Sequence, residues 1–457
     1  MKVRFEIPLT LQKVVGALSS RGSASYLVGG AVLDALMGAP VKDWDVECYG
    51  LNYQELNDLL KGFGRTSLVG RAFGIIKLWA DDEEYDFSIP RRDNKSGVGH
   101  RGFTVELDPT LDVREAARRR DLTINSIYLN LSTLEIIDPF NGVGDLKDGI
   151  LRATDPHTFV EDPLRVLRIM QILPRKGRKV DGETVELCRS MVDEFDTLPS
   201  ERLMLEFNKL MMKTEKPSAG LKFLVDCGWI NKFPELSALI DTPQNPEYHP
   251  EGDVWTHTLL VMDNAAKLRG YLPGDWKLPY MYGMLCHDMG KPATTDPVRL
   301  TAYKHESAGV DVAVSFMHRL TNNIELTERV LSIVRNHMRP YQLAKDSASA
   351  GAWKRLHNEL PLHVAAYVTQ ADRCGNFTSD VMTFTPETEK ILALADELGK
   401  EKIHPVLNGE FLIKKGRKPG PEFKRILSVA FDIQLDEGIE NPELLYEKAM
   451  QKLKRDG

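Results

Sequence analysis

The chain has 457 residues, enough for two to four domains with sizeable cores, and its content of 42% hydrophobic and 27% charged residues is ordinary for a soluble globular protein. It contains no run of about 18 apolar residues, no signal-peptide pattern and no C-x-x-C pair among its five cysteines, so we expect no membrane partner and a cytoplasmic location. The net charge of −7 gives no overall support for nucleic-acid binding, although local basic clusters can still attract phosphate.

The N-terminal part predicts a helix over residues 11–18, then a short strand that ends at Gly29-Gly30, and a second helix. Two glycines after a strand let the backbone approach a phosphate, and the following helix points free N–H groups at that anion. After a glycine-proline turn, Asp43 and Asp45 lie two residues apart, so on an extended strand both carboxylates leave the same face. Such a pair of oxygen ligands suits Mg²⁺ and a nucleotide's phosphates.

The next segments continue an α/β pattern. A helix is expected over residues 53–60, a strand pair over 66–79, and a strand over 84–89 that carries Asp86. Residues 90–103 are polar and rich in glycine, arginine and lysine, so they predict a mobile loop.

Two short segments combine arginine with carboxylate or amide side chains. Residues 117–128, ARRRDLTINSIY, suit triphosphate and ribose contacts because guanidinium groups clamp phosphate with two bonds, although a basic first turn of a surface helix is the plain alternative. Asp162 and Arg165 fall three apart around Pro163, which can sit in a first helical turn, so one helix face would carry both. Taken alone, they are an ordinary ion pair.

The second half changes in composition. Residues 200–212 predict a helix, and residues 241–252, rich in proline and polar side chains, predict a linker. Six possible metal ligands follow, most of them on apolar helical stretches: His257, His287, Asp288, His305, His337 and Asp372. Imidazole and carboxylate groups from several helices make one or two transition-metal sites with open positions for water and phosphate, and Lys291 would offset phosphate charge.

The tail starts near residue 407 with basic residues and a glycine-proline turn before an amphipathic helix over 422–434. Contact with an RNA backbone is a hypothesis for four of its side chains, namely Lys414, Lys415, Arg417 and Lys418. A solvated surface is the alternative for each basic cluster.

The motifs of the first half resemble those of the class II tRNA nucleotidyltransferase and poly(A) polymerase family, within the DNA polymerase β-like nucleotidyltransferases. The order strand, Gly-Gly, helix, turn and D-x-D resembles that family's G-G-x-V-R-D and D-x-D motif, except that Leu33 replaces the arginine. Four further runs, at 117–128, 138–152, 161–165 and 200–212, resemble the family's R-R-D-x-T-x-N, D-P-x-x-G-x-x-D-L, E-D-x-x-R and neck-helix motifs in the same order.

This resemblance implies a site for each step of nucleotide addition. Asp43 and Asp45 would be the catalytic, Mg²⁺-binding pair, and Asp86 a candidate third carboxylate. The residues implied in nucleotide binding are Gly29, Gly30, Arg119, Arg120, Asp121, Asn125, Asp162, Arg165 and Arg168.

The implied base template is chemically reasonable. The Asp162 carboxylate accepts from the exocyclic amine of cytosine or adenine, while Arg165 donates to the neighbouring ring nitrogen. Uracil and guanine place a carbonyl oxygen at that position, which Asp162 repels. The loop at 90–103 corresponds to the family's flexible loop, which helps to switch nucleotide choice.

The histidine and aspartate set over residues 257–372 resembles the HD phosphohydrolase superfamily. This implies a divalent transition metal of unknown identity and phosphodiesterase or phosphatase activity, with a degenerate structural HD domain as the alternative. The tail resembles the tRNA-proximal segment of family members with an HD domain.

Together these features predict an α+β protein: a small mixed-sheet, polymerase β-like nucleotidyltransferase head followed by an all-α neck, HD domain and tail. The expected boundaries are head 1–150, neck and base-template region 151–240, HD domain 241–400 and tail 401–457. The predicted activity is addition of C, C and A to the 3′ end of tRNA from CTP and ATP, and no protein partner is deducible. Alternatives are a CC-adding or A-adding enzyme, a poly(A) polymerase, or an HD hydrolase or RNA-binding factor with an inactive head.

Overall fold

The computed structural model describes residues 6–41, 43–68, 74–95, 103–346, 348–377 and 379–455. The chain divides into two compact units, Met1–Leu210 with Ala219–Lys232, and Met211–Ser218 with Phe233–Gly457. The centre of the predicted loop, residues 96–102, and the turn of the predicted strand pair, residues 69–73, lie outside the described residues.

The first unit is built on a mixed seven-stranded sheet with the order β3-β4-β5-β2-β1-β8-β9. Its strands are β1 (Ala24–Leu27), β2 (Trp44–Tyr49), β3 (Arg65–Ser67), β4 (Ile75–Ala80), β5 (Glu83–Ser88), β8 (Tyr128–Asn130) and β9 (Ile136–Ile137). β2 and β5 run parallel, whereas the other neighbours are antiparallel. The register places Asp45 opposite Asp86 on β5 and Glu47 opposite Tyr26 on β1.

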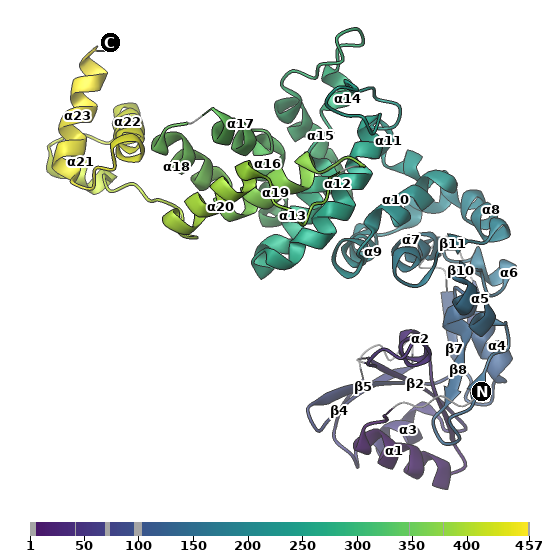
Figure 1. Ribbon diagram of the computed structural model, residues 1–457. Helices are drawn as coiled ribbons and strands as arrows, with labels where there is room; N and C mark the ends of the chain where they lie inside the picture. Colours follow the sequence, from purple (N-terminus) through teal and green to yellow (C-terminus); the bar gives the residue numbers. More distant parts are fainter. Residues whose placement is uncertain are drawn as a thin grey trace. The chain divides into compact units, whose positions relative to one another are not determined.

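Helices and two small strand pairs complete this unit. The elements are α1 (Leu9–Ser20), α2 (Gly30–Leu36), α3 (Tyr53–Leu60), β6 (Arg91–Lys95), β7 (Phe103–Leu107), α4 (Val113–Arg118), η2 (Thr123–Ser126), α5 (Gly142–Asp148), β10 (Ile150–Leu151), α6 (Pro156–Phe159), α7 (Leu164–Lys176), β11 (Lys179–Val180), α8 (Gly182–Ser190), η3 (Val192–Thr197), α9 (Ser200–Lys213), α10 (Pro217–Asp226) and η4 (Trp229–Lys232). Figure 1 shows α1 and α3 together on one face of the sheet. α3 begins with a capping box, in which Asn52 and Glu55 satisfy each other's backbone N–H groups.

The second unit is built from helices (Figure 1). They are α11 (Pro234–Ser237), α12 (Val254–Leu268), η5 (Arg269–Tyr271), α13 (Gly274–Cys286), α14 (Lys291–Thr294), α15 (His305–Leu320), α16 (Ile324–Asn336), α17 (Arg339–Lys345), α18 (Ala350–Glu359), α19 (Leu362–Arg373), α20 (Pro386–Leu398), α21 (Gly409–Lys414), α22 (Pro421–Glu437) and α23 (Pro442–Arg455). Gly283 on α13 lets Ile333 of α16 pack against its backbone, since an added Cβ would come within 2.6 Å of that side chain. The last three helices have their own small core, which includes Leu412, Ile426 and Leu445.

This architecture confirms the predicted α+β class with a small mixed sheet in the N-terminal part. One local prediction differs. Asp162 lies in the turn before α7 rather than on its first turn, because Pro163 occupies the N-cap position of that helix. Among the described helices, none has both the length and the apolar character required to cross a membrane.

Candidate active sites

The glycine pair of the head stands where β1 gives way to α2. Gly29 has a φ of +66° and is the N-cap of α2, and an added Cβ would lie 3.7 Å from the Asp45 carboxylate. Only glycine adopts this backbone conformation readily, so the residue type follows from the turn. Leu33, which departs from the family motif, is buried in α2, and the following Asp34 pairs with Lys176 of α7 at 2.7 Å.

Three carboxylates gather beside this turn. Asp43 is exposed just before β2, Asp45 is half-buried on β2, and Asp86 is its register partner on the neighbouring strand. Burial, together with the negative charges of Asp86 and Asp43, raises the pKa of Asp45 to about 6. Crowded carboxylates of this kind are stabilised by a cation, so the three residues fit a divalent metal.

Two of these carboxylates, Asp45 and Asp86, share a cavity of about 220 Å³ with arginine side chains. The residues that line it are Val28, Gly29, Asp45, Glu47, Ile75, Asp86, Ser88, Ile89, Arg91, Arg119 and Arg120. Oxygen ligands for a metal and guanidinium groups for phosphate therefore meet in one place. That combination suits a nucleoside triphosphate with its metal ion.

Glu47 is a residue of this cavity that is not among the predicted site residues. It is fully buried, and its carboxylate accepts from the guanidinium groups of Arg119 and Arg120. The alternation D-W-D-V-E carried the signal, because residues two apart on a strand face the same way.

The predicted base-reading residues make other contacts. Asp162 Oδ1 accepts from the Leu164 backbone N–H at 3.1 Å and so caps the start of α7. The Arg165 guanidinium donates to the Thr158 carbonyl at 2.6 Å and to the carbonyl of Arg119. Arg165 therefore ties the start of α7 to the segment that carries the cavity arginines.

Asp121 connects the remaining predicted nucleotide-binding residues. Its carboxylate accepts from Arg168 Nε at 2.7 Å and from the Asn125 amide at 2.9 Å. Burial alone raises the pKa of this carboxyl, but Arg168 and Asn125 outweigh burial and lower it to about 2. The structure thus joins these three residues through one buried, charged carboxylate.

In the second unit, the structure brings all six predicted histidine and aspartate residues together. His257 comes from α12, His287 and Asp288 follow α13, and Asp372 comes from α19. His257 Nε2 lies 3.0 Å from Asp372 Oδ1, and His287 Nε2 lies 3.2 Å from Asp288 Oδ2 and 3.7 Å from Asp372 Oδ1.

His305 and His337 form a second group around the other oxygen of Asp288. His305, at the start of α15, has its Nε2 3.3 Å from Asp288 Oδ1, and His337, just after α16, has its Nε2 3.8 Å from the same atom. The two Nε2 atoms are 3.0 Å apart. Asp288 therefore stands between two groups of possible ligands, with one carboxylate oxygen in each.

The second nitrogen of each ring explains why these groups fit metal ions. The Nδ1 atoms of His287, His305 and His337 lie 2.7 to 2.8 Å from the backbone carbonyls of Met284, Ala302 and Val334, which fixes each proton on Nδ1. The Nε2 lone pairs then face one another, an arrangement that repels unless a cation lies between them. Burial, with the neighbouring His287 and His305, lowers the pKa of His337 to about 3, so this imidazole stays neutral and able to bind a metal.

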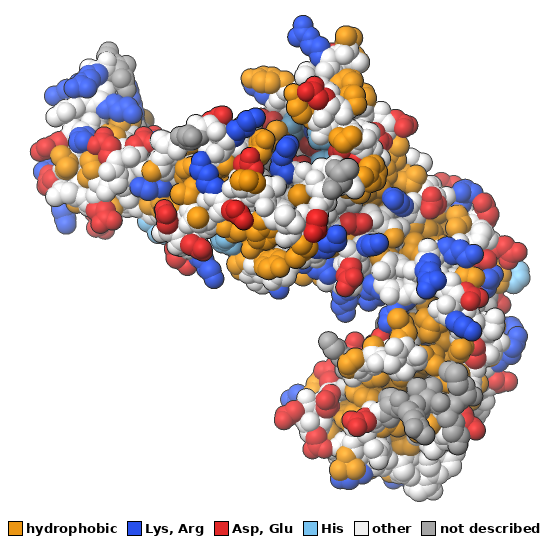
Figure 2. All heavy atoms as spheres, in the orientation of Figure 1, with side chains coloured by type: hydrophobic (Ala, Val, Ile, Leu, Met, Phe, Trp, Pro, Cys, Tyr) orange, Lys and Arg blue, Asp and Glu red, His pale blue; other side chains and the backbone are white. Residues whose placement is uncertain are grey.

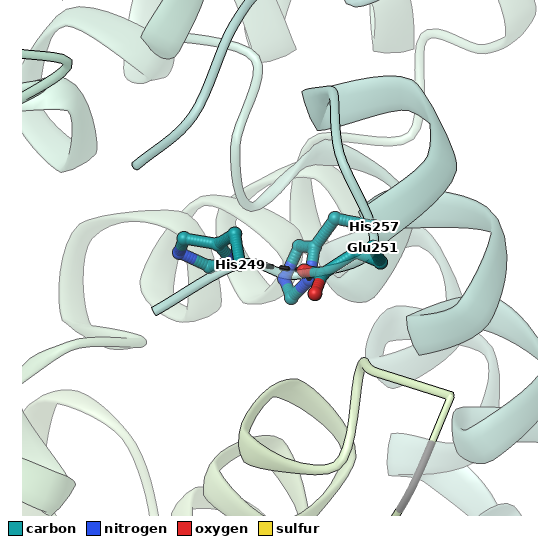
Figure 3. Close-up of side chains that lie close together, drawn as sticks. All are labelled: His249, Glu251 and His257. Carbon is teal, nitrogen blue, oxygen red and sulfur yellow. Dashed lines mark hydrogen bonds and ion pairs between the residues drawn. The ribbon is translucent and has the colours of Figure 1, made fainter. Parts of the chain in front are cut away.

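The predicted linker, residues 241–252, contributes to this site. Glu251 Oε1 lies 2.7 Å from His257 Nδ1 and 2.8 Å from His249 Nδ1, and Figure 3 shows its carboxylate directed at the His257 ring. His249 and Glu251 are not predicted from the sequence as site residues, because prolines and polar residues surround them. A carboxylate behind a ligating histidine is a usual part of a metal site.

The cluster opens into a cavity of about 370 Å³. Lys291 lies in its wall, 2.7 Å from both Asp288 Oδ2 and the amide oxygen of Gln244. The Arg373 guanidinium stacks over the Tyr341 ring at 4.5 Å, and both line the cavity. Cationic side chains beside a metal-binding cluster suit a phosphate-containing substrate.

The basic residues predicted in the tail lie on and after α21. Lys414 and Lys418 are exposed, whereas Lys415 pairs with Glu443 at 2.6 Å and Arg417 pairs with Glu422 at 2.6 Å. Figure 2 shows further Lys and Arg side chains gathered at the end of α23, where the last turn carries Lys452, Lys454 and Arg455.

Comparison with known proteins places both sites in defined families. The family description "Poly A polymerase head domain" matches residues 25–152, "Probable RNA and SrmB- binding site of polymerase A" matches 178–240, and "HD domain" matches 254–376. The multifunctional CCA protein of Xanthomonas campestris pv. campestris (strain B100) is 34% identical over 383 residues, which cover 81% of this chain and 90% of that protein. The multifunctional CCA protein of Xylella fastidiosa (strain M12) is 37% identical over 327 residues, which cover 70% and 75%.

Solved structures show the same fold. The Bacillus stearothermophilus CCA-adding enzyme in complex with CTP matches 98% of this chain and 99% of its own, with a TM-score of 0.65 and 19% identity. The Thermotoga maritima CCA-adding enzyme complexed with tRNA matches 98% and 96%, with a TM-score of 0.59 and 18% identity.

Proposed function

Because this chain belongs to the family of the multifunctional CCA proteins, we propose that it adds C, C and A to the 3′ end of tRNA from CTP and ATP and releases pyrophosphate. The observation that carries this proposal is the head cavity. In it the Asp45 and Asp86 carboxylates, opposite each other on parallel strands, share one space with Arg119 and Arg120.

In nucleotidyl transfer, the carboxylates and the arginines of the head have different roles. Domains of this kind use divalent metals, and Asp43, Asp45 and Asp86 are the residues that would hold Mg²⁺. A divalent ion bound there supplies activation of the attacking 3′-hydroxyl and stabilises charge on the α-phosphate. Arg119 and Arg120 bind the triphosphate through guanidinium–phosphate bonds and orient the α-phosphate for attack.

Base selection is proposed for Asp162 and Arg165. The carboxylate accepts from the exocyclic amine that cytosine and adenine share, and the guanidinium donates to the adjacent ring nitrogen. In the structure Arg165 donates to backbone carbonyls and Asp162 caps α7. Reading a base therefore requires these two side chains to exchange those partners for the nucleotide.

The test is sequencing of tRNA 3′ ends after incubation with all four nucleotides and Mg²⁺. Transcripts that end at the discriminator base, at C and at CC should all grow to CCA and then stop. Arrest at CC, or action only on CC ends, would make the protein a partial-addition enzyme, and long A tails would make it a poly(A) polymerase. No addition at all would refute the proposal.

A second function, metal-dependent hydrolysis of phosphate esters, is favoured by the histidine cluster. Asp288 contacts His287 through one carboxylate oxygen and His305 through the other, and Lys291 lies in the cavity wall, where it can bind phosphate. The head cavity and this cluster lie in different units, so we propose two separate activities. Release of phosphate from phosphomonoesters, or opening of 2′,3′-cyclic ends, in the presence of added transition metals tests this, and no hydrolysis with any metal would contradict it.

Domain boundaries, RNA contacts in the tail and a cellular location are also proposed. The head is proposed to extend over residues 1–150, the neck over 151–240, the HD domain over 241–400 and the tail over 401–457, with RNA contact by Lys414 and Lys418 through their exposed ammonium groups. A cytoplasmic location is proposed because all five cysteines are free thiols, as expected in a reducing compartment.

A further inference from the structure

Glu47 is buried in the head at the place where the nucleotide's triphosphate is proposed to bind. It lies on β2 two residues after Asp45, on the same strand face, and none of its surface is exposed. A buried carboxylate without partners is strongly unfavourable, so its partners define what it does.

Four donors surround this carboxylate. Oε2 accepts from Arg120 Nη2 at 2.9 Å and from Arg119 Nη2 at 3.3 Å. Oε1 accepts from the Tyr49 hydroxyl at 2.8 Å and from the Tyr128 hydroxyl at 3.0 Å. Burial raises the pKa of Glu47, but the two arginines outweigh it and hold the pKa below its ordinary value, so the side chain is an anion at neutral pH.

Aromatic rings hold this group in position. Tyr26 lies on β1 directly opposite Glu47. Its ring packs edge-on against the rings of Tyr49 and Tyr128, with ring centres 5.3 Å and 5.9 Å apart. The Arg120 guanidinium lies 5.2 Å from the centre of the Tyr128 ring and donates from Nε to the Tyr128 hydroxyl at 3.2 Å. Arg120 is therefore fixed at once by a carboxylate, a hydroxyl and a ring face.

These contacts also exclude another role. Both Glu47 oxygens accept hydrogen bonds and no part of the residue is accessible, so it is not free to act as a third metal ligand. Asp86, half-buried and in register with Asp45, is the residue suited to that position.

We propose that Glu47 is a positioning residue that holds Arg119 and Arg120 side by side at the site of the incoming nucleotide's triphosphate. The inference rests on the proposed function, because that function assigns the triphosphate to these arginines. Two adjacent guanidinium groups repel each other, and an anion shared between them keeps both in the cavity wall before the nucleotide arrives. The two guanidinium groups are then already ordered before the nucleotide binds, so binding does not have to supply the free energy of ordering them.

The test compares Glu47→Gln with wild type in nucleotide addition and in equilibrium binding of CTP with Mg²⁺. Glutamine has the same size but no charge, and only its carbonyl oxygen can accept, so its NH2 group replaces one of the two acceptor oxygens of Glu47. KM for CTP and for ATP should both rise roughly 10- to 100-fold, while KM for tRNA stays unchanged. A residue needed only for folding would instead lower the active fraction and hence kcat, without changing KM for nucleotides.

Glu235→Gln is the matched control. This carboxylate is also buried and accepts from an arginine, Arg319 at 3.0 Å, and from Ser315 at 2.7 Å, but it belongs to the second unit. The Glu235→Gln substitution should leave KM for CTP and KM for ATP unchanged. If Glu47→Gln does not fold, Tyr49→Phe removes one of the four donors and should raise KM for CTP and ATP in the same direction by a smaller factor.

The outcomes separate this inference from the function on which it rests. A wild-type protein that adds nothing to tRNA refutes the proposed function, and CTP binding then still reports on Glu47. Weaker CTP binding by the variant supports the positioning role. Unchanged KM and unchanged CTP binding in whichever variant folds overturn it, and no CTP binding by wild type overturns both proposals.

Discussion

The buried Asp121 predicts how the stability of the first unit depends on pH. Its pKa falls from 3.8 to about 2 because Arg168 and Asn125 outweigh burial, which corresponds to about 2 kcal/mol of stability at roughly 1.36 kcal/mol per pH unit. The folded-state pKa is the lower one, so this contribution is complete well above pH 3.8 and is lost as the pH falls toward 2. At pH 3 about half of it should remain.

Asp121→Asn removes the charge with little change in shape. At pH 7 the thermal transition of the first unit should shift down by roughly 4 to 8 °C, the shift expected for about 2 kcal/mol in a domain of this size, and at pH 3 the shift should be about half as large. Scanning calorimetry of the whole chain measures this, with the transition of the second unit as internal reference. Asp148→Asn, at an exposed position at the end of α5, is the control. A difference between wild type and Asp121→Asn that does not change with pH would refute the charged pairing with Arg168.

Three further predictions concern the two proposed activities. Asp45→Asn should abolish nucleotide addition to tRNA while the far-ultraviolet circular dichroism spectrum stays unchanged and the melting temperature at pH 7 does not fall, because the raised pKa of Asp45 means that its charge does not stabilise the fold. Retained addition would refute the metal assignment. Glu251→Gln should weaken metal binding in the second unit roughly 10- to 100-fold, because the carboxylate orients the ring of His257, whereas Glu235→Gln should leave that affinity unchanged in a chelator competition titration. His287→Ala should spare CCA addition and remove phosphate-ester hydrolysis, and a loss of addition would show that the cluster is not a separate site.

Local spacing in the sequence predicts part of the head site. Gly29 follows from the turn that its positive φ requires, and the two-residue spacing predicts Asp43 and Asp45 on one strand face. The structure places Asp45 on β2 but corrects the prediction for Asp43, which lies in a bend just before that strand. The position of Asp86 beside Asp45 depends on the parallel pairing of β2 with β5, which are not consecutive strands of the chain, and local spacing alone does not reveal that pairing. The same spacing puts Glu47 on the face of Asp45, but it gives no sign of the donors that converge on the Glu47 carboxylate, because Arg119, Arg120 and Tyr128 come from distant parts of the chain.

For the histidine cluster, too, the sequence predicts the residues of the site but not their arrangement. The order of six histidine and aspartate residues on apolar helices was enough to predict a shared site. The sequence did not indicate that Asp288 divides its two oxygens between two groups, because this depends on how α15 and α16 pack against the end of α13. Glu251 lies in a segment that composition assigns to a linker, and its contact with His257 is a consequence of tertiary packing.

The net charge of −7 gives no overall support for an RNA partner, and the structure explains why a whole-chain charge says little about one. Glu47, Asp121 and Glu251 are all buried and each holds an arginine or histidine side chain in a proposed site. Such carboxylates count as negative charges in the sum, yet each is already paired with the arginine or histidine side chain that it holds, so the sum does not describe the groups that a phosphate meets in a cavity. The charge that matters for a phosphate-rich substrate is therefore the local charge of each cavity wall.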